Sequence, residues 1–175
     1  MEDIKFSFKT QYDFKTFIRI SRAARKTVRK QSSLLIYFCA LVAGIAFVIK
    51  YFPKEGMELS LSTVIICIAF CLMIVALLFQ DVIEASFFKR ATKPENMAVT
   101  TEFGDEKYIL RSEGGEINCK YSDIEALVEI NEGFILCLGN NIYKMLPKET
   151  LTGGNIEEFK AFIEKKTGKS IQLVK

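Results

Sequence analysis

The sequence predicts an α+β integral membrane protein, in which a two-helix transmembrane hairpin is joined to a small antiparallel β-sheet domain closed by a C-terminal helix. Two observations lead to this fold class. The first half of the chain contains two long, uncharged apolar runs, residues 33–49 and 59–79. After Pro94 the composition changes to short segments of alternating apolar and polar residues, separated by turns. We therefore expect three regions, at residues 1–9, 10–93 and 94–175.

Both apolar runs have the length of a membrane helix. A bilayer core of about 30 Å requires roughly 20 apolar residues of helix, so we expect spans at about residues 33–52 and 59–79. Backbone amides in hydrocarbon must form hydrogen bonds within their own segment, which makes both runs helical. The loop between them is short and carries Lys50, Pro53 and Lys54. The two helices are therefore predicted to be antiparallel.

The distribution of charge predicts the orientation of this hairpin. Up to Lys93 the chain has 14 basic and 7 acidic residues, a net charge of +7, whereas the remainder has 10 basic and 14 acidic residues, a net charge of −4. Basic residues flank the hairpin at its two ends, and the loop lysines are matched by Glu55 and Glu58. Because Lys and Arg favour the cytoplasmic flanks of spans, we expect a multi-pass protein of the cell membrane with both termini in the cytoplasm.

The five cysteines agree with a reducing compartment. Three lie in the apolar runs, and only Cys119 and Cys137 belong to the predicted β-domain, so no extracellular disulfide framework is visible. Cys67 and Cys71 share a helical face and could be metal ligands. The chain has no histidine to complete such a site, and we favour their role as small apolar side chains.

Residues 4–8 alternate between apolar and polar side chains. Ile4, Phe6 and Phe8 would share one face, which is typical of a strand with one buried side. A lone strand is not stable. We therefore expect residues 1–9 to provide a strand that pairs with the C-terminal sheet.

An amphipathic helix is expected before the first span. Thr10 and Asp13 resemble a helix start, and the apolar residues that follow fall near one helical face: Phe14, Phe17, Ala24 and Val28. We favour an extension of the first membrane helix that packs on the region after the second span, where the apolar residues are Val82, Ile83, Phe87 and Phe88. The alternative places the helix on the inner leaflet, where each basic residue contributes about 1 kcal/mol. In both cases the basic residues lie at the lipid headgroups.

Small residues four positions apart occur in both spans. Ala40 with Gly44, and Cys67 with Cys71, have the spacing that allows membrane helices to approach closely. They fit packing within the hairpin or a homodimer seam. No charged residue lies within either run, so we expect no ion pathway or proton relay.

Region 94–175 is predicted to be a meander of short strands. Alternation places them at residues 97–103, 107–112, 116–121, 124–130, 134–138 and 142–146. The turns between them contain Gly, Asn and Asp, which suit tight hairpins. Asn155 and Glu158 form a capping box for a final helix that ends at Gly168. With the N-terminal strand, the sheet would have about seven strands.

The order of these elements resembles the YcxB-like membrane proteins of the bacterial inner membrane. The residues that carry the likeness are Thr10, Asp13 and Phe14, then Tyr121, Ser122, Asp123, Ile124 and Glu129, and finally Ile142, Tyr143, Leu146, Pro147 and Lys148. The resemblance implies a C-terminal domain similar to pleckstrin-homology (PH-like) folds, with no settled activity. For the 121–124 motif we favour a local turn in which Tyr121 and Ile124 point inward, and we expect Lys148 to be solvated.

Pleckstrin-homology folds in eukaryotes often bind inositol phosphates with basic residues around the first hairpin. The turn that we align with that hairpin contains Glu102, Asp105 and Glu106, with Lys107 and Arg111 nearby. Three carboxylates would repel a phosphate. We therefore expect no phosphoinositide binding.

The residue inventory argues against an enzyme. There is no histidine and no glycine-rich phosphate loop, and carboxylates such as Asp123, Glu125 and Glu129 are interpreted as solvated surface charges. We assign no catalytic, cofactor-binding or metal-binding residue and expect no cofactor.

The favoured function is a membrane-anchored cytoplasmic protein-interaction module. Its expected partners are the lipid bilayer and another membrane or membrane-associated protein, with a homo-oligomer possible and no nucleic acid. The alternative is an accessory or regulatory subunit of a membrane transport or envelope-stress system, recognised through its transmembrane hairpin. An autonomous sensor of lipid state or envelope stress fits the residues equally well.

Overall fold

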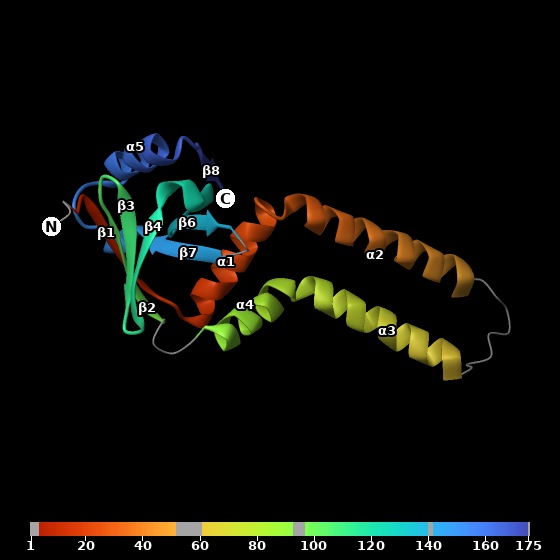
Figure 1. Cartoon of the computed structure of the whole chain (residues 1–175). Coiled ribbons are helices and arrows are strands. Elements are labelled where there is room, and N and C mark those ends of the chain that lie inside the picture. The colour runs from red at the N-terminus through yellow and green to blue at the C-terminus, as the bar shows by residue number, and fades with distance from the viewer. Residues whose placement is uncertain (1–3, 52–60, 93–96, 140–141, 175) are drawn as a thin grey trace.

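The structure, a computed structural model, describes residues 4–51, 61–92, 97–139 and 142–174. It has an α+β fold with two parts, a β-domain and a helical arm that extends from it (Figure 1). The strands are β1 (Phe6–Gln11), β2 (Ala98–Phe103), β3 (Lys107–Ser112), β4 (Gly115–Lys120), β5 (Ile124–Ile130), β6 (Gly133–Leu138), β7 (Ile142–Pro147) and β8 (Ile171–Leu173). The helices are α1 (Phe14–Lys26), α2 (Lys30–Tyr51), α3 (Leu61–Leu78), α4 (Gln80–Ala91) and α5 (Ile156–Thr167).

The helical arm is an insertion between two neighbouring strands of one sheet. β1 pairs with β2 in antiparallel register, with Phe8 opposite Thr101 and Gln11 opposite Ala98. Helices α1 to α4 lie between these strands in sequence, so the arm leaves and re-enters the β-domain at the same end of the sheet (Figure 1). The connection that a hairpin turn would normally make is here made by the entire arm.

The β-domain contains two four-stranded sheets, and the prediction of one antiparallel sheet was wrong. The first sheet has the order β1-β2-β3-β4 and the second the order β7-β6-β5-β8. A short 3₁₀ turn at Tyr121–Asp123 separates β4 from β5, so the meander does not continue across it. β8 pairs with β5 in parallel, and its three residues are too few to show an alternating pattern.

The core of the β-domain is built around Phe159 of α5. Its ring centroid lies 4.7 Å from that of Phe8, 5.2 Å from that of Phe103 and 5.3 Å from that of Phe134. All four side chains are buried. These contacts join α5 to both sheets. The pairs with Phe8 and Phe103 are edge-to-face and the pair with Phe134 is tilted, and aromatic pairs add about 1 kcal/mol each beyond burial.

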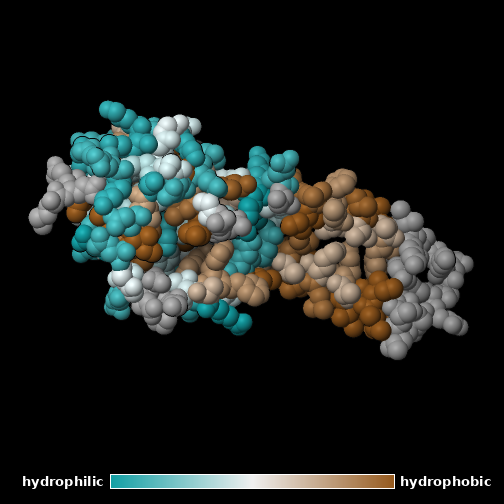
Figure 2. Space-filling model, in the orientation of Figure 1, coloured by the Kyte–Doolittle hydropathy of each residue, from teal (hydrophilic) through white to brown (hydrophobic). Residues whose placement is uncertain are grey.

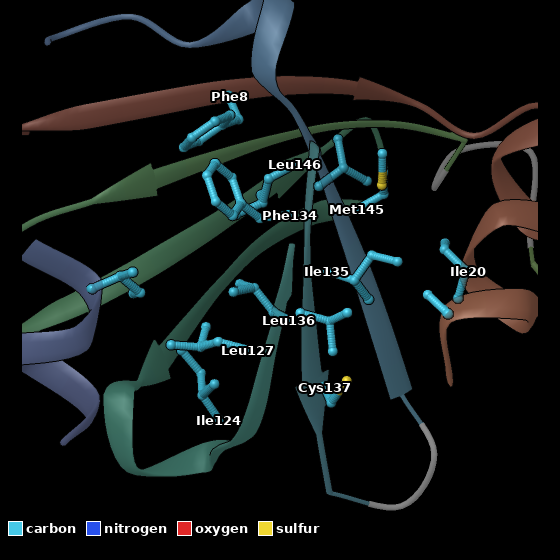
Figure 3. Packing of buried hydrophobic residues seen from close by; sticks show 14 of the residues in the cluster. Phe8, Ile20, Ile124, Leu127, Phe134, Ile135, Leu136, Cys137, Met145 and Leu146 are labelled. Atoms are coloured by element: carbon cyan, nitrogen blue, oxygen red, sulfur yellow. The ribbon is translucent and has the colours of Figure 1, made fainter. Parts of the chain in front are cut away.

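A second part of the core joins α1 to the second sheet. Figure 3 shows Ile20 of α1 facing Ile135 of β6 and Met145 of β7, and all three are buried. Leu136 and Leu146 belong to the other face of the same strands, because successive side chains in a strand alternate. The second sheet therefore buries both of its faces, one against α1 and one within the domain.

The final helix starts and ends as its sequence predicts. The Asn155 side chain accepts a hydrogen bond from the Glu158 backbone N–H (2.9 Å), and the Glu158 carboxylate accepts one from the Asn155 N–H (3.0 Å). Gly168 ends the helix with φ of 67°, a left-handed conformation that glycine adopts without strain. The predicted capping box is confirmed.

The start of α1 differs from the predicted one. Thr10 lies in β1 and donates to the Met145 carbonyl (2.6 Å), whereas Asp13 is the N-cap and accepts from the Thr16 backbone N–H (2.7 Å). α1 packs against α4, as favoured from the sequence. The residues used are partly different, since Ala85 is buried and Val82, Ile83 and Phe87 are exposed.

Both predicted spans end in bends on the side of the β-domain. The turn Thr27–Arg29 separates α1 from α2, and α3 and α4 meet at a bend of 71°. Within the described residues, no helix alone has the length and apolar character needed to cross a membrane, although α3 and α4 taken together do by length and composition. The predicted loop residues Pro53, Lys54, Glu55 and Glu58, and the boundary at residues 93–94, lie outside the described residues.

Candidate functional site

Two bidentate ion pairs clamp the base of the helical arm. Arg25 donates to Asp81 through Nε (2.9 Å) and Nη2 (2.7 Å), and Arg29 donates to Glu84 through both Nη atoms (2.8 Å each). The hydrogen bond to Asp81 raises the pKa of the Arg25 guanidinium. Bidentate pairs fix orientation as well as distance. These four residues, Arg25, Arg29, Asp81 and Glu84, are called the clamp, and they fix the position of α4 relative to α1 and the turn that follows it.

Tyr37 extends the clamp into α2. Its hydroxyl accepts hydrogen bonds from Gln80 Nε2 (2.8 Å) and from Arg25 Nη1 (3.2 Å). Arg25 and Arg29, two of the basic residues that the sequence places at lipid headgroups, are thus each paired with a carboxylate of α4. Local sequence does not reveal this pairing, since the partners are more than fifty positions apart.

A pocket opens between the arm and the β-domain. It has a volume of about 440 Å³ and is lined by side chains of α1, α4, the first sheet and β7. Most of the lining is apolar, including Phe88, Val99, Leu110, Ile117 and Ile142. We call it the Lys144 pocket, because Lys144 supplies its one charged side chain among the described residues.

Lys144 occupies an inward position of β7. It alternates with Met145 and therefore faces the same side as Leu146, which is fully buried. Desolvation lowers the pKa of Lys144 below its ordinary value. Within the described part of the chain its ammonium has no hydrogen-bond acceptor or carboxylate partner. Its Nζ lies 5.9 Å from the centroid of the Tyr12 ring, and the Cys119 thiol is an electrostatic neighbour that acts on the Lys144 pKa in the opposite direction to desolvation.

Tyr12 forms another wall of the Lys144 pocket. Its side chain is buried and stacks on Phe17 with ring centroids 5.7 Å apart. The hydroxyl oxygen accepts a hydrogen bond from the Met145 backbone N–H (3.3 Å). Burial raises the pKa of Tyr12, so the hydroxyl keeps its proton at neutral pH and remains a donor.

Glu129 is buried, and its prediction as a solvated carboxylate was wrong. Lys148 donates to one carboxylate oxygen (2.7 Å) and Lys160 to the other (3.0 Å). Burial alone would raise the pKa of Glu129, but these two hydrogen bonds hold it below its ordinary value. The expectation that Lys148 is solvated is also wrong, because Lys148 further donates to the Ile130 carbonyl (3.1 Å).

The acidic turn between β2 and β3 is partly neutralised. Asp105 accepts hydrogen bonds from Lys5 (2.8 Å) and Lys166 (3.1 Å), which lower its pKa. This turn connects β2 to β3, the second and third strands of the first sheet. The connection after the first strand is the helical arm.

The Tyr121–Asp123 motif is a local turn, as favoured from the sequence. The Asp123 carboxylate accepts from the Lys120 backbone N–H (3.1 Å), and the buried Tyr121 hydroxyl donates to the Gly104 carbonyl (2.7 Å). All five cysteines are free thiols. Among the described residues, no three acidic, cysteine or histidine side chains lie close enough to hold a metal ion.

Sequence reasoning assigned no site residue and missed Lys144. A signal for it exists, because Lys144 lies between Ile142 and Leu146 at a position that strand alternation turns inward. A lysine at an inward position is unusual. The pocket itself requires the packing of α4 on the domain, which alternation within β7 does not reveal.

Comparison with known proteins gives one match. The family model for YcxB-like proteins matches residues 103–163, from the last residue of β2 into α5 and less than half of the chain. No curated protein and no solved structure matches the sequence. The matched segment contains β3 to β7, Glu129 and Lys144, so this central part of the β-domain is similar to YcxB-like proteins.

Proposed function

We propose that this chain is a membrane-anchored cytoplasmic module, in which α2 and α3 cross the bilayer as a hairpin and the β-domain binds another protein at the membrane surface. The support comes from the surface of the arm. Large apolar side chains are exposed along both helices, among them Leu35 and Leu72 at 63% and 64%. Figure 2 shows this apolar surface on the arm and a mainly hydrophilic one on the β-domain.

The length of the arm is consistent with this anchoring. α2 has 22 residues, which corresponds to about 33 Å of helix, and a bilayer core is about 30 Å thick. An exposed apolar surface of this extent is rare on proteins that stay in water. The clamp residues lie at the base of the hairpin, where charged groups reach the headgroup region.

The arrangement of the β-domain supports a PH-like fold. Two sheets pack around one core, and the helix α5 closes the domain at the end opposite the arm (Figure 1). The site that eukaryotic pleckstrin-homology domains use for inositol phosphates surrounds their first hairpin. In this chain α1 to α4 are inserted at that connection, so we propose that phosphoinositides are not its ligands.

The partner surface that we propose is the outer edge of β4. β4 is the last strand of the first sheet, and among the described strands it pairs only with β3. Its side chains are mostly exposed, including Ile117 at 63%. An unpaired edge can accept an extended segment of a partner as an additional strand. The exposed edge of β4 is the observation on which the proposed binding of a protein partner depends.

The alternative function, an accessory or regulatory subunit recognised through the hairpin, is favoured by the apolar faces of α2 and α3. The two helices stack Phe47 on Phe70 with ring centroids 4.8 Å apart, but they leave an apolar groove between them. A partner's membrane helix could occupy such a groove. Recognition would then take place within the bilayer and not at β4.

Photo-crosslinking in the native membrane distinguishes these functions. A photoreactive amino acid is placed at Ile117 on β4, at Leu173 on β8 or at Leu72 on α3, since these apolar side chains are exposed to nearly the same extent (63%, 63% and 64%). Crosslinking of a protein from Ile117 but not from Leu173 supports the module. Crosslinking from Leu72 alone supports the accessory subunit and contradicts the proposed role of β4.

The membrane anchoring has its own test. A reporter enzyme fused to the C-terminus is expected to show its activity on the cytoplasmic side of the membrane and none outside the cell. The protein is also expected to remain in the membrane fraction after extraction with carbonate. Release of the chain into the soluble fraction would contradict the anchoring. Activity of the reporter outside the cell would contradict the orientation.

A further inference from the structure

We propose that the Lys144 pocket binds a fatty acid, with the carboxylate paired to the Lys144 ammonium and the acyl chain against the apolar wall. This inference goes beyond the proposed function, which assigns the domain a protein partner and no small ligand. It rests on three features of the pocket, which are an unpaired cation, a second hydrogen-bond donor and an extended apolar lining.

The first feature is the charge. An ammonium taken partly out of water is unfavourable unless an anion accompanies it. Elsewhere in the domain the half-buried Lys148 and Lys160 share the anion Glu129, and the half-buried Lys169 donates to the Ile124 and Glu125 carbonyls. Lys144 has no such partner among the described residues, and its side chain faces the pocket. A ligand that brings one negative charge would complete this site.

The second feature is the Tyr12 hydroxyl. Its oxygen is already used as the acceptor for the Met145 N–H, so the hydroxyl proton is available for a ligand oxygen. The Tyr12 ring and the Lys144 ammonium are adjacent. A carboxylate between them would accept from both groups, one donor for each oxygen. A phosphate, with more oxygens and more charge, would leave acceptors unmatched in this pocket.

The third feature is the shape and lining. The volume of about 440 Å³ lies in the range of small-molecule sites, roughly 300–1,000 Å³. The lining beyond Lys144 is mainly aliphatic and aromatic, with Val99, Leu110 and Ile142 from three different strands and Phe88 from α4. An apolar chain gains free energy from contact with each of these side chains.

The surface of α4 offers a path from the bilayer to this pocket. Val82, Ile83 and Phe87 are exposed on α4, which has 12 residues and is about 18 Å long. Ala91 and Phe88, near its end, line the pocket, and Figure 2 shows apolar surface in the region of α4 between the arm and the β-domain. This path, unlike the binding site itself, rests on the proposed membrane anchoring.

The test uses the acylation rates of individual lysines in the full chain, reconstituted in lipid nanodiscs. A low dose of acetic anhydride at pH 8 modifies unprotonated amines, and peptide mass spectrometry measures each site. Sodium decanoate, kept below its micelle concentration, is expected to slow the acetylation of Lys144 by about tenfold, the effect of a charge-assisted hydrogen bond. Lys165 is exposed on α5 and is the internal control.

Matched probes separate the parts of the ligand. Decanol has the chain without the charge and acetate has the charge without the chain, and neither is expected to protect Lys144. Equal protection by decanol, equal protection by acetate, or no protection by decanoate would each overturn the proposal. None of these results depends on crosslinking at Ile117, so failure of the partner surface and failure of the ligand site can be told apart.

A second measurement uses variants of the full chain and a dansyl-labelled undecanoic acid as the probe. Lys144→Met keeps an apolar side chain of similar length, and we expect it to weaken probe binding by about tenfold. Lys144→Arg keeps the charge and is expected to retain most of the binding, whereas Lys165→Met is the matched control. Undiminished binding in Lys144→Met that is folded by circular dichroism would overturn the proposal.

Discussion

The guanidinium of Arg25 donates hydrogen bonds to both carboxylate oxygens of Asp81, which lies 56 positions along the chain. The distances are 2.9 Å from Nε to Oδ1 and 2.7 Å from Nη2 to Oδ2. Asp81 is more buried than its partner, with 13% of its side chain exposed against 27% for Arg25. This pair joins the helix that leaves the β-domain to the helix that returns to it. α1 and α4 can therefore separate from each other only if this contact breaks.

Asp81→Asn is expected to destabilise the protein by about 2 kcal/mol, because it leaves a partly buried guanidinium without its anion. Thermal unfolding of the full chain in nanodiscs measures this effect. Arg25→Lys should also destabilise the protein, though less than Asp81→Asn does, since lysine keeps the charge but cannot reproduce the two parallel hydrogen bonds. Arg22→Ala is the control, because Arg22 lies 3.6 Å from Asp81 and is 61% exposed; a loss equal to that of Asp81→Asn would contradict the role of the bidentate pair.

Glu129 makes the stability of the β-domain dependent on acidic pH. Its pKa is lowered in the folded state from the ordinary value of 4.5, so its stabilising effect is complete above pH 4.5 and is lost as the pH falls through the folded-state pKa. Glu129→Gln is expected to cost about 1–2 kcal/mol at pH 7 and to reduce the loss of stability on acidification. Denaturant titrations at pH 7 and below pH 4.5 measure both effects.

The control for this prediction is Glu157→Gln. Glu157 also pairs with Lys160 (3.2 Å), but it is 82% exposed, so the change should cost less than about 0.5 kcal/mol. If the two variants had the same pH dependence, the acid sensitivity would come from surface charge in general and not from Glu129.

Local signals in the sequence account for the elements whose positions were predicted well. The strands Lys107–Ser112 and Ile124–Ile130 have the predicted bounds, because alternation and flanking turn residues are both properties of adjacent positions. The capping box of α5 is a signal of the same kind. Local signals do not predict the division into two sheets or the three-residue strand β8, since both depend on pairing between segments that are distant in sequence.

The same distinction explains why the ion pairs of Glu129, Arg25 and Arg29 were missed. Glu129 follows Val128 in β5, so its side chain lies on the opposite face of the strand from that of Val128. Its burial is tolerated only because Lys148 and Lys160 reach its carboxylate from two other elements. Arg25 and Arg29 belong to a run of basic residues that is typical of a membrane flank, and their carboxylate partners lie on α4. A sequence pattern shows which groups are charged, whereas the fold decides which of them are paired.

Lys144→Met is expected to stabilise the ligand-free protein at neutral pH, on the order of 1 kcal/mol, because it removes an unpaired and partly buried charge. The pKa of Lys144 is lowered from the ordinary value of 10.5, so between the folded-state pKa and 10.5 the unfolded state binds more protons than the folded one. The native chain therefore gains stability as the pH rises through this window. The advantage of the variant should be complete below the folded-state pKa and shrink toward pH 10.5.

Denaturant titrations of both chains at neutral pH and near pH 10.5 measure this change, with Lys165→Met as the control for removal of an exposed charge. An advantage that stayed constant with pH would show that the variant acts through packing alone. A variant less stable than the native chain at every pH would mean that the ammonium already has a stabilising partner in the protein, which would contradict the anion site proposed at Lys144.

Gly44 is expected to be a point of close approach within the arm. A Cβ at this position would lie 3.4 Å from the Phe70 ring of α3, so a larger side chain must push Phe70 away from its stack with Phe47. Gly44→Leu is expected to cost about 1–3 kcal/mol through overpacking, measured by thermal unfolding in nanodiscs, whereas Ala43→Leu on the exposed surface of α2 should be nearly neutral. The sequence left open whether the small residues pack within the hairpin or form a homodimer seam, and the contact with Phe70 favours the hairpin. If Gly44→Leu instead converted a dimer to a monomer with unchanged unfolding of the monomer, the seam would be the correct interpretation.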